Sequence, residues 1–328
     1  MPFVTKKDPM ISRRALATAF AAAFSVASLT LAGHLGAADA AHVKAVEAWR
    51  AKHEADYIKE YVQLAGLFFL KPNANTAGSG PSNDIVLPKS APASIGRFVY
   101  QNNAIRFEPR AGASVKLRNQ PVTSPVELRS DGGTSPADEL SIGDITLWVH
   151  ESGKRRAIRM RDPHGEVARS FAGFRWLPVD ERYRVTGKFI KDPAPRKLLV
   201  PNQLGDEEEN TTEGVVEFVL NGQTLRMRPM TTRPGRLWFT FRDGTSGHET
   251  YANARFLYAD LRPDGTTVLD FNEAYNPPCA FNPHTTCPIP LRENRLPVKV
   301  LAGEKAYPVH VPLPSATTPR TGPGTGGG

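Results

Sequence analysis

The polar residues best able to do chemistry gather in the last third of the chain, in loops and at the ends of expected strands. They are Asp243, Glu249, Tyr251, Arg255, Asp270, Asn272, Asn276 and Glu304. In the stretch "VLDFN", Asp270 and Asn272 fall on one face of a strand, because side chains alternate along a strand. A strand with an acid and an amide on one face lies at a solvent edge or lines a pocket. This cluster is therefore the main candidate site.

Two roles are open for the cluster. In the first, Asp270, Glu249 and Asp243 act as general base or as ligands of a divalent metal, which the sequence permits but does not require. The residues that would hold a polar or anionic ligand are Arg255, Tyr251, Asn272, Asn276 and Glu304. In the second, the same residues form a buried polar network that ties the following loop to the sheet, with Arg255 paired to Asp270.

The following loop, "NPPCAFNPHTTCP", holds both cysteines of the chain and is too rich in proline for a regular helix. Cys279, His284 and Cys287 form a C-x4-H-x2-C spacing, but structural zinc takes four ligands and no second pair lies nearby. We therefore assign no metal ligands here. In an exported protein, two cysteines at this spacing favour a disulfide between Cys279 and Cys287 over the alternatives of free thiols or a metal site.

The N-terminal segment has the pattern of a secretory signal peptide. A basic start precedes an alanine-rich apolar stretch, and Ala38 and Ala40 suit cleavage after residue 40. The run "SRRAL" at residues 12–16 resembles the start of a twin-arginine signal, so both export routes stay open. We expect a periplasmic or extracellular protein with no transmembrane span once the signal is removed.

The composition is typical of a globular protein built from many short strands. Of 328 residues, 40% are hydrophobic, and 29 prolines and 27 glycines are spread along the chain as turn residues. The net charge of +8 is dispersed, which favours a basic envelope protein over a nucleic-acid binder. In the strand "KRRAIRMRD", Arg155, Arg159 and Arg161 share one face, and Ile158 and Met160 the other. That arginine face could receive an anion or pair with acidic neighbours.

Apolar residues recur at helical spacing only near the start of the mature chain, where we place a helix over residues 41–70. Strand-like runs then follow at intervals of about eight to twelve residues, the spacing of an antiparallel sandwich or barrel. The expected fold is mainly β. We divide it into β subdomains at 71–160 and 161–310, followed by a disordered tail at 311–328.

Turn chemistry refines this outline. The dipeptides Asn221-Gly222 and Asp264-Gly265 stand between apolar runs and predict tight hairpin turns, because both tolerate positive φ. The Asn-, Gly- and Ser-rich stretch at 71–83 is expected to be a loop.

Several long stretches resemble a known family. The runs "SFAGFRWLPVDERYRVTGKF", "FRDGTSGHETYANARFLYADL" and "NEAYNPPCAFNPHTTCPIPLRENRLPVKVLAGEKAY" resemble the bacterial and archaeal family called domain of unknown function 1684. The resemblance extends over about residues 49–308. That family has no assigned reaction, so the resemblance implies where function would lie, without its chemistry.

A shorter stretch, "NTAGSGPSNDIVLP", resembles the opening of a forkhead-associated β-sandwich. This implies a sandwich-like first half. The Ser-Arg-x-His stretch that follows in that family is absent here, so no phosphopeptide binding is implied.

Two functions are therefore compared. We expect an exported β protein that binds a small polar or anionic ligand through Arg255 and the loop amides, because no complete catalytic set is present. The alternative is a hydrolase-type enzyme that uses Asp270 or Glu249 as base or metal ligand, which the density of polar groups favours.

Overall fold

The structure is a computed structural model that describes residues 40–309 and 311. The chain divides into two compact units, residues 1–49 and 50–328, and every strand lies in the second. The predicted signal peptide, apart from its last residue, lies outside the described residues. So does the predicted disordered tail, apart from its first residue.

One long helix opens the described chain, but it is shorter than predicted. It runs to residue 57 and closes in a π-helical turn, η1 (Ile58–Val62). Strand β1 (Leu64–Phe69) then replaces the expected last turns of helix. The run "LAGLFF" is apolar on both faces, and periodicity cannot distinguish such a strand from a buried helix.

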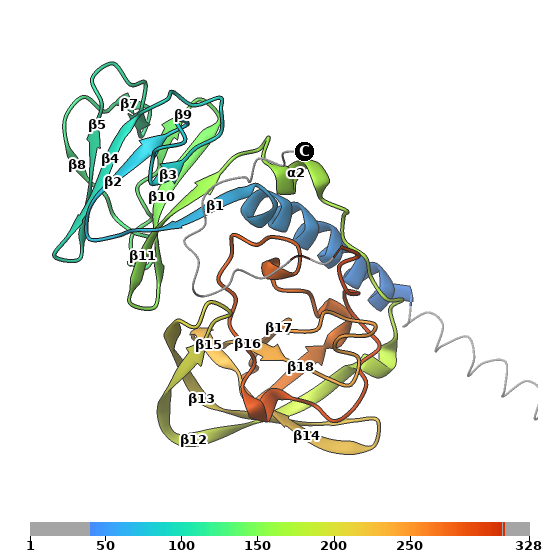
Figure 1. Ribbon diagram of the computed structural model, residues 1–328. Helices are drawn as coiled ribbons and strands as arrows, with labels where there is room; N and C mark the ends of the chain where they lie inside the picture. The colour runs from blue at the N-terminus through green and yellow to red at the C-terminus, as the bar shows by residue number, and fades with distance from the viewer. Residues whose placement is uncertain (1–39, 310, 312–328) are drawn as a thin grey trace, which may run out of the picture. The chain divides into compact units, whose positions relative to one another are not determined.

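Two sheets enclose the first hydrophobic core (Figure 1). One has the order β1-β11-β10-β9-β6-β7 and the other β3-β2-β4-β5-β8, and their pairs are antiparallel except β2 with β3. Their strands are β2 (Asn73–Gly78), β3 (Ile85–Val86), β4 (Gly96–Gln101), β5 (Ala104–Pro109), β6 (Lys116–Leu117), β7 (Gln120–Pro121), β8 (Val126–Glu127), β9 (Leu140–Ile142), β10 (Ile145–Ser152) and β11 (Arg155–Arg161). This half is sandwich-like, as expected.

The alternation predicted for β11 is confirmed by its packing. Ile158 and Met160 lie in the first core, together with Phe98 and Phe107 of the opposite sheet. Ala157 points to the other face, where it joins a small separate apolar cluster. The sheet therefore buries one face completely and leaves the second free for other contacts.

Two further sheets enclose a second core. Their orders are β14-β13-β12-β18 and β15-β16-β17, and all their pairs are antiparallel. Their strands are β12 (Arg184–Pro201), β13 (Glu207–Leu220), β14 (Gln223–Met227), β15 (Met230–Arg233), β16 (Arg236–Phe241), β17 (Arg255–Asp260) and β18 (Thr266–Asp270). None of the described sheets closes into a barrel, so the sandwich alternative holds.

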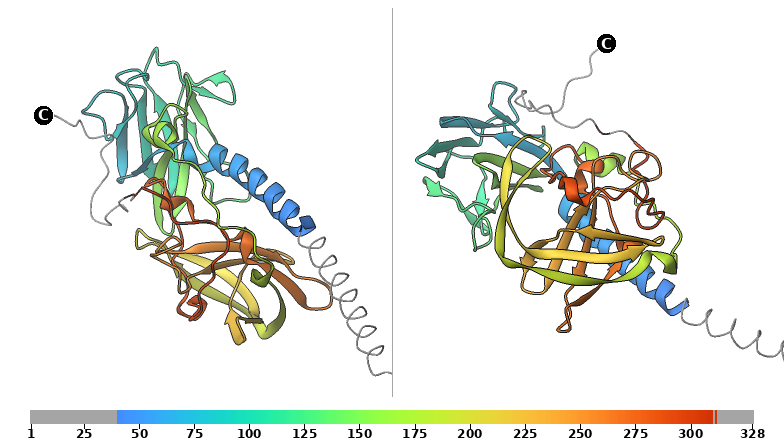
Figure 2. Two further views of the ribbon diagram at one scale, coloured as in Figure 1. Left: turned by 90° about the vertical axis from the view of Figure 1, so that its right-hand side faces the viewer. Right: turned by 90° about the horizontal axis from the view of Figure 1, so that it is seen from below.

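The longest hairpin is formed by β12 and β13, which Figure 2 shows as a bent ribbon. Its register shifts between Lys191 and Arg196, where a bulge interrupts the pairing of the two strands. The acidic run at 206–210 lies mostly within β13.

The turn predictions have mixed outcomes. Asn221 and Gly222 both have positive φ, 50° and 75°, and join β13 to β14 as expected. Gly265 has a φ of 78°, and its amide donates to the Arg262 carbonyl at 3.0 Å, so the tight turn at Asp264-Gly265 is confirmed. An antiparallel bridge between Leu261 and Thr267 closes it, although β17 and β18 belong to different sheets. The predicted loop at 71–83 is wrong over 73–78, which form β2 and pair with β4, whereas 79–83 are turns and bends as expected.

Short helical turns complete the fold. They are α2 (Glu166–Ser170), η2 (Glu181–Tyr183), η3 (Phe271–Glu273), η4 (Pro278–Ala280) and η5 (Arg292–Asn294). The last three shape the proline-rich loop after β18. In the part of the chain described here, no helix has both the length and the apolar character needed to cross a membrane.

Candidate functional site

Arg255 is fully buried, and its guanidinium donates to groups within the fold. Its Nη1 donates to Asp243 Oδ2 at 2.7 Å and to the Val300 carbonyl at 3.0 Å, while Nη2 donates to the Ala302 carbonyl. The other carboxylate oxygen of Asp243 accepts from the Thr245 amide and hydroxyl. Both side chains are 0% exposed, so this ion pair ties β17 to the C-terminal segment and faces no solvent.

Asp270 and Asn272 stabilise the turn that follows β18. The Asp270 carboxylate caps η3 by accepting from the backbone and side-chain amides of Asn272 at 3.1 and 2.9 Å. The Asn272 side chain also bonds both backbone groups of Asp180. The expected Arg255–Asp270 pair is wrong, because Arg255 pairs with Asp243 and Asp270 lies 3.7 Å from Arg184.

Glu304 and Asn276 form a second buried contact. The Asn276 backbone amide donates to Glu304 Oε2 at 2.7 Å, and the Asn276 side chain donates to the Lys305 carbonyl. Burial penalises the charged form and raises the pKa of Glu304 to about 8. Glu304 is therefore largely protonated at neutral pH.

Glu249 and Tyr251 lie near the edge of this network. Glu249 reaches Lys299 at 3.5 Å with both groups partly in solvent. The Tyr251 hydroxyl contacts the Cys279 carbonyl at 3.4 Å and accepts from Asn253 at 3.0 Å. Burial raises the pKa of Tyr251, so its hydroxyl stays neutral.

The structure thus brings the predicted residues together in pairs, Asp243 with Arg255, Asp270 with Asn272, and Asn276 with Glu304. Asp270 contacts Asn272 and Arg184, and Glu249 contacts Lys299. Among residues 40–309 and 311, no group of three or more His, Cys, Asp or Glu side chains could hold a metal ion. Their contacts match the expected buried network more closely than an open site.

The disulfide prediction is wrong for this structure, because both cysteines are buried free thiols. The turn η4 directs the Cys279 backbone amide toward Cys287 Sγ at 3.3 Å, so an amide hydrogen bond takes the place of a sulfur–sulfur bond. Tyr251 and Thr285 hydroxyls each lie 3.7 Å from one of the sulfurs. Hydrogen bonds and prolines therefore shape the loop.

A different site lies on the outer face of the first sandwich. The arginine face of β11 opens into a cavity of about 690 Å3 whose lining includes Tyr61, Arg118, Asp131, Trp148, Arg159 and Arg161. Arg159 stands between Leu67 of β1 and Trp148 of β10 in the strand register. The predicted alternation of this strand pointed to the face, but only the structure shows that the face borders a cavity.

The two arginines at this cavity have unused hydrogen-bonding capacity. Buried Nε atoms of both Arg159 and Arg161 lack a partner among the described residues. Arg161 lies over the Trp148 ring at 5.0 Å and reaches Glu139 only at 3.8 Å. The Arg159 guanidinium donates from Nη2 to His150 Nε2 at 3.0 Å. Burial lowers the pKa of Arg159, yet a guanidinium stays charged in proteins.

A hydrogen bond to His150 helps to position the Arg159 side chain. His150 Nδ1 lies 2.7 Å from Asp131 Oδ2, and a carboxylate can only accept, so Nδ1 carries the proton. His150 Nε2 is then the acceptor for the Arg159 guanidinium. Burial lowers the pKa of His150, which favours this neutral form. The Thr286 hydroxyl lies 3.2 Å from the same Nε2.

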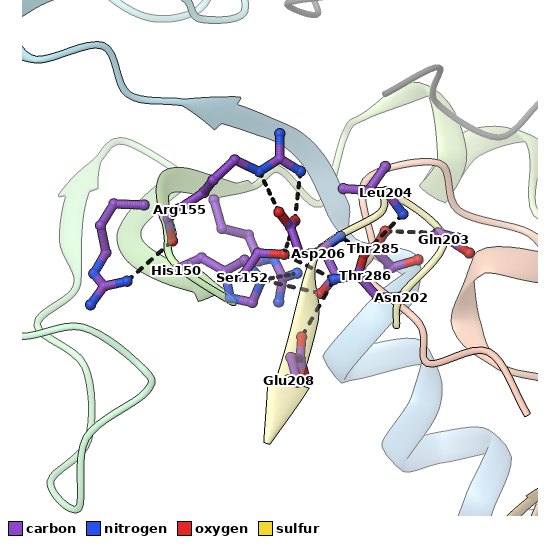
Figure 3. A network of polar contacts seen from close by, with 12 residues as sticks. His150, Ser152, Arg155, Asn202, Gln203, Leu204, Asp206, Glu208, Thr285 and Thr286 are labelled. Atoms are coloured by element: carbon purple, nitrogen blue, oxygen red, sulfur yellow. Dashed lines mark hydrogen bonds and ion pairs between the residues drawn. The ribbon is translucent and has the colours of Figure 1, made fainter. Parts of the chain in front are cut away.

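Arg155, on the same strand face, shows how an arginine is paired within the fold (Figure 3). Arg155 donates two bonds of 2.6 Å to Asp206, which also accepts from Ser152 at 2.6 Å. Asn202 donates to the same Ser152 and completes the network. On one strand face, then, Arg155 is fully paired and Arg159 is not.

Comparison with known proteins finds a family match for part of the chain. Residues 169–305 match the family described as "Protein of unknown function (DUF1684)". The predicted family resemblance is confirmed over this segment, and the match does not extend upstream to residue 49. The segment holds the Arg255–Asp243 network, whereas Arg159 and the cavity residues named above lie before it.

Structural comparison finds an uncharacterized protein of Haloarcula marismortui, solved by solution NMR, with a TM-score of 0.37 and 27% sequence identity. The alignment covers 44% of this chain and 82% of that one. Among curated proteins there is no match.

The buried ion pair gives a stability prediction. Arg255→Met strands the Asp243 carboxylate in the core, so we expect a loss of about 3–5 kcal/mol in unfolding free energy, measured by urea denaturation. Arg255→Met with Asp243→Leu should recover part of the loss, because no charge is then stranded. The control Arg106→Met removes an exposed partner of Glu108 and should cost less than about 1 kcal/mol. Equal effects of Arg255→Met and Arg106→Met would contradict this assignment.

Glu304 gives a pH prediction. Its pKa rises from 4.5 to about 8 on folding, so the folded protein keeps a proton that the unfolded chain releases. Between pH 4.5 and 8 its contribution to stability therefore falls, by up to about 1.4 kcal/mol per pH unit, and is constant above that range. Glu304→Gln should remove this slope from unfolding curves measured at several pH values. An unchanged slope would show that Glu304 titrates normally.

Proposed function

We propose that this protein binds a small polar ligand through the ligand's anionic group, in the cavity on the outer face of β10 and β11. Arg159 would be the anchor. One observation carries the proposal: Arg159 is half-buried at a cavity, and no carboxylate among the described residues lies within 4.0 Å of its guanidinium.

Two buried arginines of the second half differ from Arg159 because each is paired with a carboxylate. Arg255 has Asp243 at 2.7 Å, and Arg228 has Asp192 at 2.7 Å and Glu293 at 2.8 Å. A charge removed from water without an ionic partner costs free energy that the fold does not recover. A ligand carboxylate or phosphate would supply the partner that Arg159 lacks, and its planar fork suits two-point binding.

The surroundings of Arg159 support a binding role. Tyr61, Trp148, Ser141 and Thr146 contribute aromatic surface and hydroxyl groups to the cavity wall. The cavity volume is in the range of small-molecule sites. His150 accepts a hydrogen bond from only one nitrogen, Nη2, of the Arg159 guanidinium, so the other N–H groups of Arg159 are not used in this contact.

The hydrolase alternative gains no comparable support. Asp270 is used as a turn cap, Asp243 is saturated by Arg255 and backbone groups, and Glu249 is partly exposed beside Lys299. The proposed site also replaces Arg255 as the ligand-binding arginine.

Export remains part of the proposal, on the sequence of the first forty residues alone. A ligand-binding protein of the cell envelope would be found in the periplasmic or extracellular fraction. Mass spectrometry of that fraction should find a chain that begins at Ala41, and an uncleaved chain in the cytoplasmic fraction would contradict export.

The binding role is tested with Arg159→Gln. Calorimetric titration with acetate, benzoate, phosphate and sulfate should detect at least one anion that binds wild type with a dissociation constant below about 10 mM. Arg159→Gln should weaken that binding at least tenfold, the loss expected for a charge-assisted hydrogen bond of about 1.5–3 kcal/mol.

The matched control is Arg106→Gln, which removes the same charge from an exposed position on β5. It should bind like wild type. Because Arg159 has no ionic partner to strand, Arg159→Gln should also unfold no more easily than wild type. Equal anion affinity in the wild type and Arg159→Gln, or no binding by any of the four anions, would refute the proposal.

A further inference from the structure

Some charged side chains that line the cavity have an ionic partner within the protein, and others do not. Its lining contains three arginines and four carboxylates. Arg118 pairs with Asp138 at 2.5 Å, and the same carboxylate also accepts from Arg129 at 2.8 Å. Arg161 faces Glu139 at 3.8 Å. These groups form ion pairs without any ligand.

Three charged groups of the lining remain. Asp131 accepts from His150, from the Trp148 indole at 3.2 Å and from a backbone amide, so its oxygens are occupied. Arg159 has no carboxylate partner within 4.0 Å among the described residues. Glu60 has no cationic partner within 4.0 Å among the described residues either, and its side chain contacts the neutral hydroxyl of Tyr61.

We propose that the ligand of this cavity is a zwitterion of the amino-acid type, with its carboxylate on Arg159 and its ammonium group on Glu60. This inference rests on the proposed function and refines it. Each end of such a ligand meets a lining group of opposite charge that has no ionic partner. Asp131, the other carboxylate without one, already accepts hydrogen bonds from His150, Trp148 and a backbone amide.

The net charge of the cavity favours the same class of ligand. With three positive and four negative side chains, the lining already carries an excess of one negative charge. A phosphate dianion would add two more in a half-buried space, which costs Coulomb energy. A zwitterion adds no net charge and still satisfies Arg159.

The different burial of Arg159 and Glu60 indicates how the two ends of the ligand are placed. Arg159 is half-buried with a solvent-free Nε, whereas Glu60 is exposed. The carboxylate therefore lies inside and the ammonium group at the mouth. A cavity of about 690 Å3 has room for more than one residue, so a free amino acid and a short peptide share the required chemistry.

The test compares ligands that differ in one charged group. The probes are the twenty common amino acids, 4-aminobutanoate, 6-aminohexanoate and the dipeptide Ala-Ala, each titrated by calorimetry into the full chain. Every probe that binds is then compared with its deaminated acid and its decarboxylated amine. We expect at least one zwitterion to bind at least tenfold more tightly than either counterpart. A dipeptide that binds more tightly than free alanine would identify a peptide ligand, and the reverse a free amino acid.

Two variants locate the ends. Glu60→Gln should abolish the tenfold advantage of the zwitterion and leave the affinity of the deaminated acid unchanged. Arg159→Gln should weaken both. The control Glu209→Gln removes the same charge from an exposed residue that pairs with Lys197 outside the cavity, and it should leave all affinities unchanged. Glu60 is exposed, so its variant should fold normally, which an unchanged unfolding midpoint verifies.

The possible failures are distinguishable. If deaminated acids or phosphate bind in an Arg159-dependent way and the ammonium group adds nothing, the zwitterion inference is overturned and the proposed function stands. If Glu60→Gln keeps the full advantage of the zwitterion, the assigned ammonium site is overturned. If no carboxylate or phosphate binds, both are overturned.

Discussion

The cost of taking a charge out of water is the constraint on which this structure depends. Arg255 and Arg228 meet it with carboxylates held at 2.7–2.8 Å, and Glu304 meets it by retaining its proton. The proline-rich loop is held to the second core largely by such polar groups, because its sequence forms only short 3-10 turns. Arg159 is a half-buried charge with no carboxylate within 4.0 Å among the described residues, which is why it marks the proposed site.

Strand β11 connects the fold to that site. Its alternate residues fill the first core, and pairing with β1 and β10 on both sides fixes its register. A slip by one residue would bury Arg159 in the core and expose Ile158, so the register is strongly specified. The direction of the guanidinium is therefore a consequence of core packing, and the site needs no dedicated loop to support it.

Much of the fold could be predicted from local sequence. The β class, the face alternation of β11 and the Asn221-Gly222 turn all follow from short-range patterns. The helix end was misplaced because "LAGLFF" fits a helix and a buried strand equally well. Pairing across sheets, such as the separation of β17 from β18, depends on contacts far apart in sequence and left no local signal.

The site was harder to predict. Polar density points to Asp270, Arg255 and their neighbours, but density alone cannot distinguish an arginine that is paired with a carboxylate, as Arg255 is with Asp243, from one that has no ionic partner. Arg159 was recognised as part of an arginine face, without evidence to separate it from Arg155, which lies four residues before it. The distinction depends on Asp206, a residue distant in sequence that reaches Arg155 and not Arg159.

The contact between His150 and Thr286 links the cavity to the loop that carries Cys287. His150 Nε2 touches both Arg159, at the cavity, and Thr286, which directly precedes the buried thiol of Cys287. A rearrangement of Arg159 that moves His150 would therefore disturb the hydrogen bond to the residue next to this thiol. The rate at which Cys287 reacts with a thiol reagent would then report on the occupancy of a cavity whose walls contain no cysteine.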